Sequence, residues 1–314
     1  MRIYDVENLF VVRQMSEVVQ SVQFVGGESM ANNEKIVVTG ASGNLGKLVI
    51  QELLAKGISN IIATTRTPDS LTAFAAQGVD VRMADFKSPA TLTGVFEGGT
   101  RMLLISTRDI GLRVQQHGAA VDAAKAAGVE HVIYTSWPDP HHSVAAVSAD
   151  HAATEDLILK SGLKYTFLGN HLYAEVLMWA SLPKALEVGI LYGAAGTGRA
   201  AYVTRQDCAY AAAGVLEHAA LHENKRYRIS GPKAYSHEEL AALVSEITGK
   251  KLSYSDLSPE EFKKVLAQSG MPEGFLSFEL AIKGGEIEPV TRAVEELSGH
   301  SPQSLQDYLE SALK

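Results

Sequence analysis

The chain has 314 residues, of which 46% are hydrophobic and 20% charged, and its formal net charge is −8. This length and composition are typical of one large globular α/β domain or of two unequal lobes. Nucleic acids and anionic membranes attract basic surfaces, so the negative charge argues against both as the main partner. Every apolar run is shorter than the roughly 18 residues that a membrane span needs. We therefore expect a soluble protein that acts on a small molecule.

Cysteine usage and the N-terminal segment bear on the compartment. The single cysteine, Cys208, cannot form an internal disulfide, which favours the reducing cytoplasm. It lies in an alanine-rich stretch, where a small buried side chain is a better interpretation than a reactive thiol. Residues 1–29 carry Asp5, Glu7 and Glu17 among their apolar residues, so a signal peptide is not expected. We interpret them as an N-terminal extension of unknown role, non-essential or from an upstream start, in preference to a functional arm.

From residue 35 onward, short apolar runs alternate with helical patterns. The pattern predicts strands at residues 36–38, 61–65, 79–83, 102–105, 132–134 and 165–168, and helices at 45–56, 68–77, 89–96, 112–127 and 152–160. Continuous apolar strands separated by helices indicate a parallel sheet covered on both faces. The predicted fold class is therefore α/β, a doubly wound parallel-sheet Rossmann domain over residues 30–169.

After residue 169 the regular alternation ends. Helical patterns cover residues 173–188, 205–218, 237–248 and 259–269, with a glycine-rich turn at 193–198 and a candidate short strand at 252–254. This composition predicts a smaller, mainly helical C-terminal lobe over residues 170–314, with some segments returning to the Rossmann domain. A substrate would bind in a cleft between the two lobes.

A glycine-rich motif follows the first predicted strand and opens the first predicted helix. Glycines there let the chain turn sharply and let a pyrophosphate approach backbone N–H groups at a helix N-terminus. The alternative, a tight turn without a ligand, is less favoured because the following strand–helix units are in place. The motif supplies the candidate cofactor-binding residues Gly40, Ser42, Gly43, Asn44, Leu45 and Gly46.

The ends of the next strands supply further candidates. Arg66 follows the second strand, where an arginine can pair with a ribose 2′-phosphate, so NADPH is expected and NADH is expected to bind more weakly. The alternative is a solvated surface arginine. Asp85 and Phe86 end the third strand, where they would meet the adenine or merely begin a helix beside the core. Ser106 and Thr107 end the fourth, where small polar side chains would let the nicotinamide half pass.

Taken together, these motifs resemble the NmrA-like family of atypical short-chain dehydrogenases, with its bacterial quinone reductases and triphenylmethane reductases. The resemblance rests on GASGNLGKLVIQELL, Arg66, ADF at 84–86, LLIST, QQHGAAVDAAKAAGVEHVIYTS and the NHLY turn, and it spans residue 35 to about residue 314. It implies that residues 170–175 contact the cofactor and that residues 202–207 approach it. The candidates added in this way are Asn170, His171, Tyr173, Glu175 and Arg205.

The chain departs from its family just before that turn. Relatives often carry an arginine where this chain has Gly169, so we expect the nicotinamide end to be more open or differently charged. Trp137, Asn170 and Tyr173 are the candidate substrate contacts, although a purely structural Trp137 is equally well supported. A homodimer is one open alternative for the assembly.

The usual proton donor of short-chain dehydrogenases is missing. Their tyrosine carries a lysine four residues later, and none of the eleven tyrosines here does. His151 and Glu155 stand where the relevant helix begins, so His151 is the candidate catalytic acid; an ordinary surface pair is the favoured alternative. His141 and His142 form a pair on a predicted loop, which we interpret as solvated, so no metal site is expected.

A quinone suits a site without a strong acid. Hydride transfer to a simple ketone makes a basic alkoxide, whereas a quinone makes a weakly basic hydroquinone anion that water can protonate. The first hypothesis is therefore an NADPH-dependent reductase of quinones or similar conjugated acceptors. The alternative is a non-catalytic NADP(H) sensor that binds a regulatory partner, as other NmrA-like proteins do.

Overall fold

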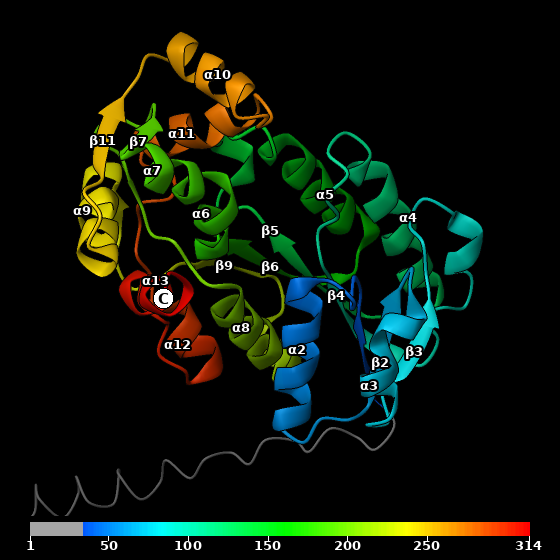
Figure 1. The fold of residues 1–314 in the computed structure, drawn as a ribbon. Coiled ribbons are helices and arrows are strands. Elements are labelled where there is room, and N and C mark those ends of the chain that lie inside the picture. Colours follow the sequence, from blue (N-terminus) through cyan, green and yellow to red (C-terminus); the bar gives the residue numbers. More distant parts are fainter. Residues whose placement is uncertain (1–33) are drawn as a thin grey trace, which may run out of the picture. The chain divides into compact units, whose positions relative to one another are not determined.

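Short apolar runs form a central parallel sheet. In the computed structural model, which describes residues 34–314, the strand order is β3–β2–β1–β4–β5–β6–β9, and every neighbouring pair is parallel (Figure 1). The strands are Lys35–Val38 (β1), Ile61–Thr65 (β2), Asp80–Met83 (β3), Gly99–Leu104 (β4), His131–Ser136 (β5), Lys164–Asn170 (β6) and Lys225–Ile229 (β9). The order reverses between β1 and β4, the crossover point at which doubly wound sheets bind their ligands. The predicted fold class is confirmed. The N-terminal extension lies outside the described residues.

The seventh strand, β9, was not predicted. Its sequence KRYRI contains three basic residues and therefore reads as polar. It pairs only with β6 in this sheet and forms its edge, where half of the side chains meet solvent. This strand brings Arg226 and Arg228 alongside the end of β6, so basic residues from late in the chain reach the sheet.

Two pairs of helices flank the sheet. Helices Arg113–Ala126 (α4) and Ser148–Ser161 (α5) pack together, and Asn44–Ala55 (α2) packs on Arg205–Glu217 (α8) on a different side of the strands (Figure 1). Helix α8 packs in turn on Ala293–Ser298 (α12), so closely that a Cβ at Gly214 would overlap the backbone of Leu297. Cys208 of α8 is 2% exposed, which confirms the small buried side chain.

Two predicted helices are shorter than expected. The segment from Pro68 begins with a 3-10 turn, Pro68–Leu71 (η1), before Thr72–Ala75 (α3), and the segment from Pro89 is only a 3-10 turn, Pro89–Leu92 (η2). Gly94 follows η2 with a left-handed φ of 68°, a conformation that no helix continues.

The remaining helices and strands pack around a second apolar core, apart from Pro259–Gln268, whose Phe262 and Leu266 belong to a smaller cluster. These elements are Ala174–Ala180 (α6), Leu182–Val188 (α7), Ile190–Gly193 (β7), Arg199–Ala200 (β8), Tyr235–Ser236 (β10), His237–Thr248 (α9), Ser253–Asp256 (β11), Pro259–Gln268 (α10), Phe275–Lys283 (α11) and Leu305–Ala312 (α13). The short strands pair as β10–β8 and β11–β7. The single helix expected at residues 173–188 is broken at Ser181, because Pro183 lies in the first turn of α7 and has no N–H to continue α6.

Residues Lys35–Lys314 form one compact unit. The division into lobes at residues 169 and 170 therefore stays a prediction. In residues 34–314, we find no helix with the length and apolar character required to cross a bilayer.

Candidate functional site

The glycine motif forms the turn between β1 and α2. Gly40 adopts a left-handed φ of 58°, and its carbonyl accepts a hydrogen bond from the N–H of Gly43 at 2.9 Å. A Cβ on Gly46 would lie 2.5 Å from the oxygen of Gly40, so only glycine fits there. Gly43 is the N-cap of α2, and neither a capping side chain nor an acidic residue covers the first turn. The N–H groups of that turn are thus available to an anion.

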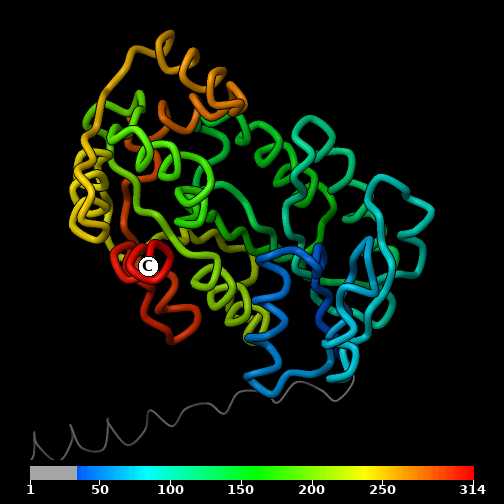
Figure 2. The backbone as a smooth tube through the Cα atoms, viewed as in Figure 1, coloured from blue at the N-terminus to red at the C-terminus, as the bar shows by residue number. Residues whose placement is uncertain are grey.

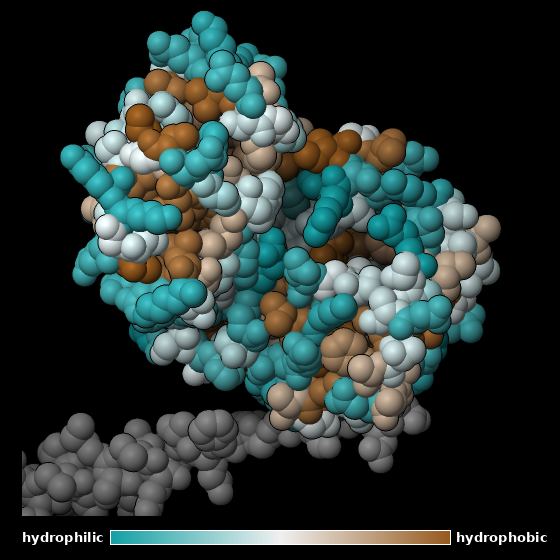
Figure 3. Space-filling model, viewed as in Figure 1, coloured by the Kyte–Doolittle hydropathy of each residue, from teal (hydrophilic) through white to brown (hydrophobic). Residues whose placement is uncertain are grey.

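The space beside this helix end is hollow. Figure 3 shows the hollow next to the N-terminal end of α2, between the surface over α2 and the surface over α5. Of the other motif residues, Asn44 is exposed and Leu45 is buried. Ser42 lies 2.7 Å from Thr65, hydroxyl to hydroxyl, which ties the loop to the end of β2.

The side chain of Arg66 is available at the end of β2. It is exposed, and it makes no hydrogen bond or ion pair with the residues that the structure describes. Asp109, from the β4–α4 loop, forms an ion pair with Lys87 at 2.9 Å, and its pKa is lowered mainly by hydrogen bonds from Gln116 and Lys87, with a smaller contribution from the charge of Arg66. A free guanidinium beside the glycine loop suits a phosphate.

Asp85 and Phe86 follow β3. The carboxylate of Asp85 accepts a hydrogen bond from the N–H of Lys87 at 3.0 Å. One of its two oxygens is therefore already bonded within its own turn. Phe86 is partly exposed and packs against the apolar core of the sheet. Both positions agree with an adenine contact and with a structural turn, so the sequence-based alternatives stay open.

The Ser106–Thr107 turn after β4 is held by buried side chains. Thr107 donates its N–H to Nε2 of His117 at 3.1 Å and accepts a bond from Nε of Arg113 at 2.9 Å, while Ser106 donates its N–H to Thr135. Burial lowers the pKa of His117 to about 3, so the ring is neutral, and Nδ1 must carry the proton toward Thr154 at 3.0 Å. Both the N–H and the carbonyl of Thr107 are thus bonded to side chains of α4, which hold the turn in place.

The Asn170–Tyr173 turn after β6 meets the segment before α8. Tyr173 forms a β-bridge with Val203, and the two stretches can be followed side by side in Figure 2. Asn170 donates to the Tyr173 hydroxyl at 3.1 Å, and the Arg205 guanidinium lies 4.9 Å from the centre of the Tyr173 ring. Glu175 accepts the N–H of Arg205 at 2.9 Å. Burial lowers the pKa of His171, behind the turn, to about 4.

Three buried polar atoms at these strand ends have no hydrogen-bond partner among the described residues. They are Oγ1 of Thr64, Oγ1 of Thr107 and Oδ1 of Asn170, at the ends of β2, β4 and β6. Buried polar atoms without partners are uncommon in folded proteins and indicate a missing ligand or water. The three atoms, the open helix end and Arg66 together fit an elongated anionic ligand such as a nicotinamide dinucleotide.

His151 and Glu155 do not form the expected surface pair. His151 is 7% exposed and Glu155 is 0% exposed, because this face of α5 packs on β5. His151 Nδ1 lies 2.8 Å from the Tyr134 hydroxyl, and burial lowers the pKa of His151 well below its ordinary value. Glu155 accepts a bond from Ser136 at 2.5 Å and pairs with Arg226 of β9. No hydrogen bond joins the two side chains in the described structure.

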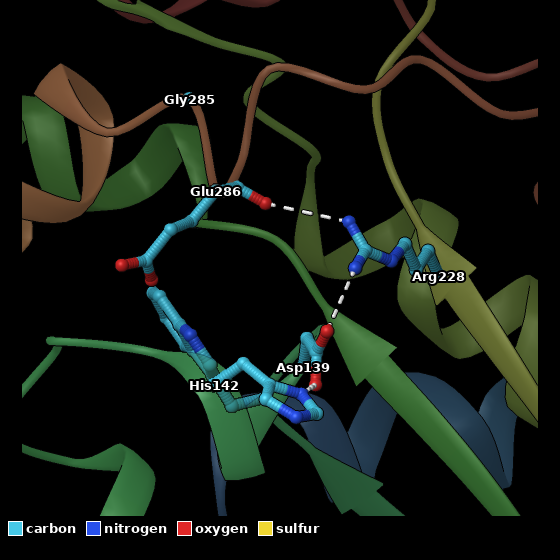
Figure 4. A pocket seen from close by; sticks show the side chains of 6 residues that line it. Asp139, His142, Arg228, Gly285 and Glu286 are labelled. Atoms are coloured by element: carbon cyan, nitrogen blue, oxygen red, sulfur yellow. Dashed lines mark hydrogen bonds and ion pairs between the residues drawn. The ribbon is translucent and has the colours of Figure 1, made fainter.

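The space beside Gly169 is filled, so the more open end expected from the sequence is not found, while the alternative of a different charge stays a prediction. A Cβ at this position would lie 2.7 Å from Cα of Pro138 and 2.9 Å from the carbonyl oxygen of Trp137, so the loop after β5 fills the space. Arg228, the neighbour of Gly169 on β9, supplies a positive charge in the same region. It pairs with Asp139 at 3.3 Å and reaches the carbonyl of Glu286 at 3.5 Å, around a cavity of about 180 Å³ (Figure 4).

Trp137 and His142, which also line that cavity, bear on two sequence-based predictions. Trp137 is 5% exposed, donates to Ser143 at 2.9 Å and belongs to the second apolar core, so its role at a substrate stays a prediction. His142 is exposed in a 3-10 turn, Pro140–His142 (η3), with Nδ1 3.0 Å from Asp139, so the segment is not a plain loop. In residues 34–314 no group of three or more histidine, cysteine, aspartate or glutamate side chains has metal-binding geometry.

Sequence reasoning missed the residues that support the site from behind. His117 and Tyr134 lie within the recognised segments, and their side chains approach each other at a ring separation of 5.4 Å. A histidine on the apolar side of an alanine-rich helix is the signal that points to His117, since a buried histidine needs partners for its nitrogens. Arg228 carries no such signal, because its strand was not predicted.

The chain is similar to known proteins over most of its length. A sequence model described as the NmrA-like family matches residues 32–309. Quinone oxidoreductase 2 of Escherichia coli is 39% identical over 276 residues, which are 86% of this chain and 96% of that protein. The E. coli quinone oxidoreductase structure with NADPH has a TM-score of 0.84 at 36% identity, covering 89% of this chain and all of that one. Citrobacter sp. triphenylmethane reductase with NADP(H) has a TM-score of 0.80 at 36% identity, covering 88% of this chain and all of that one.

Proposed function

The chain belongs to the NmrA-like family, and from this premise we propose that it is an NADPH-dependent oxidoreductase that transfers a hydride to a quinone or a similar conjugated acceptor. The observation that carries the proposal is the likeness to a quinone oxidoreductase over 96% of that protein. The open helix end and the unpartnered atoms at the strand ends support a dinucleotide in the same place.

The nucleotide half is held by backbone and by one arginine. The N–H groups that begin α2 would bind the pyrophosphate, and the glycines leave it room to approach. Arg66, exposed and without an ion pair to the described residues, would bind the 2′-phosphate, which distinguishes NADPH from NADH. Bound NADPH supplies the hydride.

The nicotinamide half is held by the two turns after β4 and β6. Thr107 Oγ1 and Asn170 Oδ1 are the unpartnered atoms there, and both would orient the ring. The backbone of Thr107 is bonded to His117 and the amide of Asn170 to Tyr173, so both residues are held by the protein itself. Rigid placement of two rings face to face is the main catalytic contribution that this site offers.

The acceptor needs little acid from the protein. A quinone that accepts a hydride becomes a hydroquinone monoanion, which takes its proton from water. His151, the candidate acid, is kept neutral by burial and is bonded to Tyr134, so it is a weak proton source at neutral pH. This arrangement favours an electron-poor acceptor over a simple ketone.

The test measures NADPH consumption by the purified protein with a panel of quinones, dyes and aldehydes. We expect turnover with quinones and none with simple aldehydes, followed as loss of NADPH absorbance. The alternative, an NADP(H) sensor, predicts no turnover with any acceptor while NADPH and NADP⁺ bind with different affinities. That outcome would overturn the oxidoreductase proposal.

A further inference from the structure

A second cavity lies within the C-terminal cluster, away from the glycine loop. Its volume is about 90 Å³, and its walls come from α6, β7, α9, α10 and α11. Most of the lining is apolar and includes the aromatic side chains of Tyr192, Tyr202, Phe262, Phe275 and Phe278. Leu172 joins the wall from the turn that also carries Asn170 and Tyr173. Val176, Ala180 and Met271 are partly exposed, which places the mouth between α6 and the start of α11.

Aromatic rings form a row along this cavity. The exposed Trp179 packs edge-on against Phe275 at 5.7 Å, Phe275 packs against Phe278 at 5.7 Å, and Phe278 packs against the buried Trp137 at 5.8 Å. Trp179 is 55% exposed beside the cavity, although large aromatic side chains are usually covered. Figure 3 shows apolar surface gathered where α7, α10 and α11 lie. A ring bound in the cavity could pack edge-to-face or offset against the rings of this row.

The polar groups of the cavity form a buried pair with one free position. His237 is 4% exposed, and its Nε2 lies 3.0 Å from both carboxylate oxygens of Glu279, so Nε2 carries a proton that it donates. Glu279 also accepts the N–H of Ala194 at 2.8 Å. Nδ1 of His237 is buried and has no hydrogen-bond partner among the described residues. When Nε2 carries the only ring proton, Nδ1 is a hydrogen-bond acceptor, and no donor from the described residues reaches it.

We propose that this cavity is a binding site for a small aromatic ring that carries a hydroxyl group, with the hydroxyl donating to Nδ1 of His237. An enclosed cavity of about 150 Å³ takes up benzene, so this cavity of about 90 Å³ encloses only part of one ring, and the rest of that ring would lie in the open mouth beside Phe275. A dinucleotide does not fit. The site therefore goes beyond the hydride-transfer function proposed above and does not depend on it.

The two tryptophans report on occupancy. The chain contains only Trp137 and Trp179, and both contact rings that line the cavity. Titration of the intact protein with phenol should change its tryptophan fluorescence to saturation. Toluene, of the same shape without the hydroxyl, should bind about three- to tenfold more weakly, the ratio that corresponds to one neutral hydrogen bond.

Two variants separate the cavity from unspecific apolar binding. His237→Leu should abolish the preference for phenol over toluene while leaving toluene binding in place. Ala180→Leu, at the last residue of α6, should weaken both ligands more than about fivefold because it fills the mouth. Ala126→Leu is the matched control at the last residue of α4, where the side chain is exposed and far from the cavity lining.

The outcomes are distinct. Saturable binding that loses its phenol preference in His237→Leu and its affinity in Ala180→Leu supports the site. Equal affinities for phenol and toluene in the unmodified protein, or equal behaviour of Ala180→Leu and Ala126→Leu, overturn it. If His237→Leu does not fold, His237→Gln serves in its place with the same expected loss of preference. None of these readouts uses NADPH, so a failure of the quinone reductase proposal would not affect them.

Discussion

In the cofactor site that we propose, the nucleotide end and the nicotinamide end are built from different parts of the protein. At the nucleotide end the chain offers backbone N–H groups, and the essential feature is the absence of side chains at Gly43 and Gly46. At the nicotinamide end the chain offers side chains, Thr107 and Asn170, which are held by buried partners. A single added side chain should therefore abolish cofactor binding at the nucleotide end. Removal of one side chain at the nicotinamide end should reduce turnover only in part.

The most severe test of this difference is Gly43→Val. A Cβ at Gly43 would lie 3.1 Å from the oxygen of Gly40, and the branches of valine would occupy the approach of the pyrophosphate. We expect NADPH binding and activity to fall below detection, measured by titration and by steady-state rate. Gly274→Val is the control, because nothing lies within 4 Å of a Cβ there. Retained NADPH affinity in the folded Gly43→Val protein would show that the pyrophosphate lies elsewhere.

Arg66→Asp tests the charged side chain proposed to bind the 2′-phosphate at the nucleotide end. Losing a charge-assisted pair should weaken NADPH by roughly 1–3 kcal/mol, about 5- to 150-fold, and should leave NADH nearly unchanged. Dissociation constants for both nucleotides, with Arg66→Lys as the charge-preserving control, provide the comparison. If NADPH and NADH lose affinity equally, Arg66 does not bind the 2′-phosphate.

Asn170→Ala tests a graded loss at the nicotinamide end. The variant removes the amide that bonds to the Tyr173 hydroxyl at 3.1 Å and the unpartnered Oδ1. We expect turnover with benzoquinone to fall about tenfold at saturating NADPH, the effect of one or two hydrogen bonds. Tyr173→Phe is the matched variant. An equal loss in both would mean that Asn170 acts only by positioning Tyr173.

The supporting histidine gives the nicotinamide end a pH dependence. The pKa of His117 is lowered by burial from 6.5 to about 3, so the folded protein keeps this ring neutral where the unfolded chain protonates it. The contribution of this group to stability is therefore full above about pH 6.5 and falls as the pH drops toward 3, by about 1.4 kcal/mol per pH unit. Between pH 7 and pH 4, the free energy of unfolding in urea should fall by roughly 3 kcal/mol less in His117→Gln than in the unmodified protein. An unchanged slope would place the acid sensitivity in other groups.

The smallest effect is expected for His151→Ala. If the hydroquinone anion takes its proton from water, turnover should fall less than about tenfold, compared with the roughly 10²–10⁴ typical of a lost general acid. The measurement is the steady-state rate with saturating NADPH and a simple benzoquinone, made after the variant is shown to be folded. A loss above about a hundredfold with NADPH affinity intact would make His151 the proton donor. Carbonyl substrates would then become the better proposal.

Local sequence patterns predicted most of the fold and the glycine turn at which we propose the nucleotide end. The glycine motif, its flanking strand and helix, and Arg66 lie within one short stretch, so their geometry follows from near neighbours. The nicotinamide end depends on contacts between distant residues, such as Thr107 with His117 and Tyr173 with Val203. Residue patterns do not encode such pairings. The charged β9 strand shows the same limit, because its place at the sheet edge is set by pairing with β6 rather than by its own apolar content.

The loop after β5 fills the space beside Gly169, and this limits which substitutions position 169 accepts. Position 169 and the backbone of residues 137–138 occupy one space, since a Cβ would come within 2.7 Å of Pro138. An arginine introduced at position 169 would therefore need a new loop after β5 in the same step. Arg228, on the neighbouring strand, carries charge in this region but is bonded to Asp139 and Glu286, so an exchange there must also consider these partners. In protein engineering, residue 169 and the loop that covers it should therefore be exchanged together.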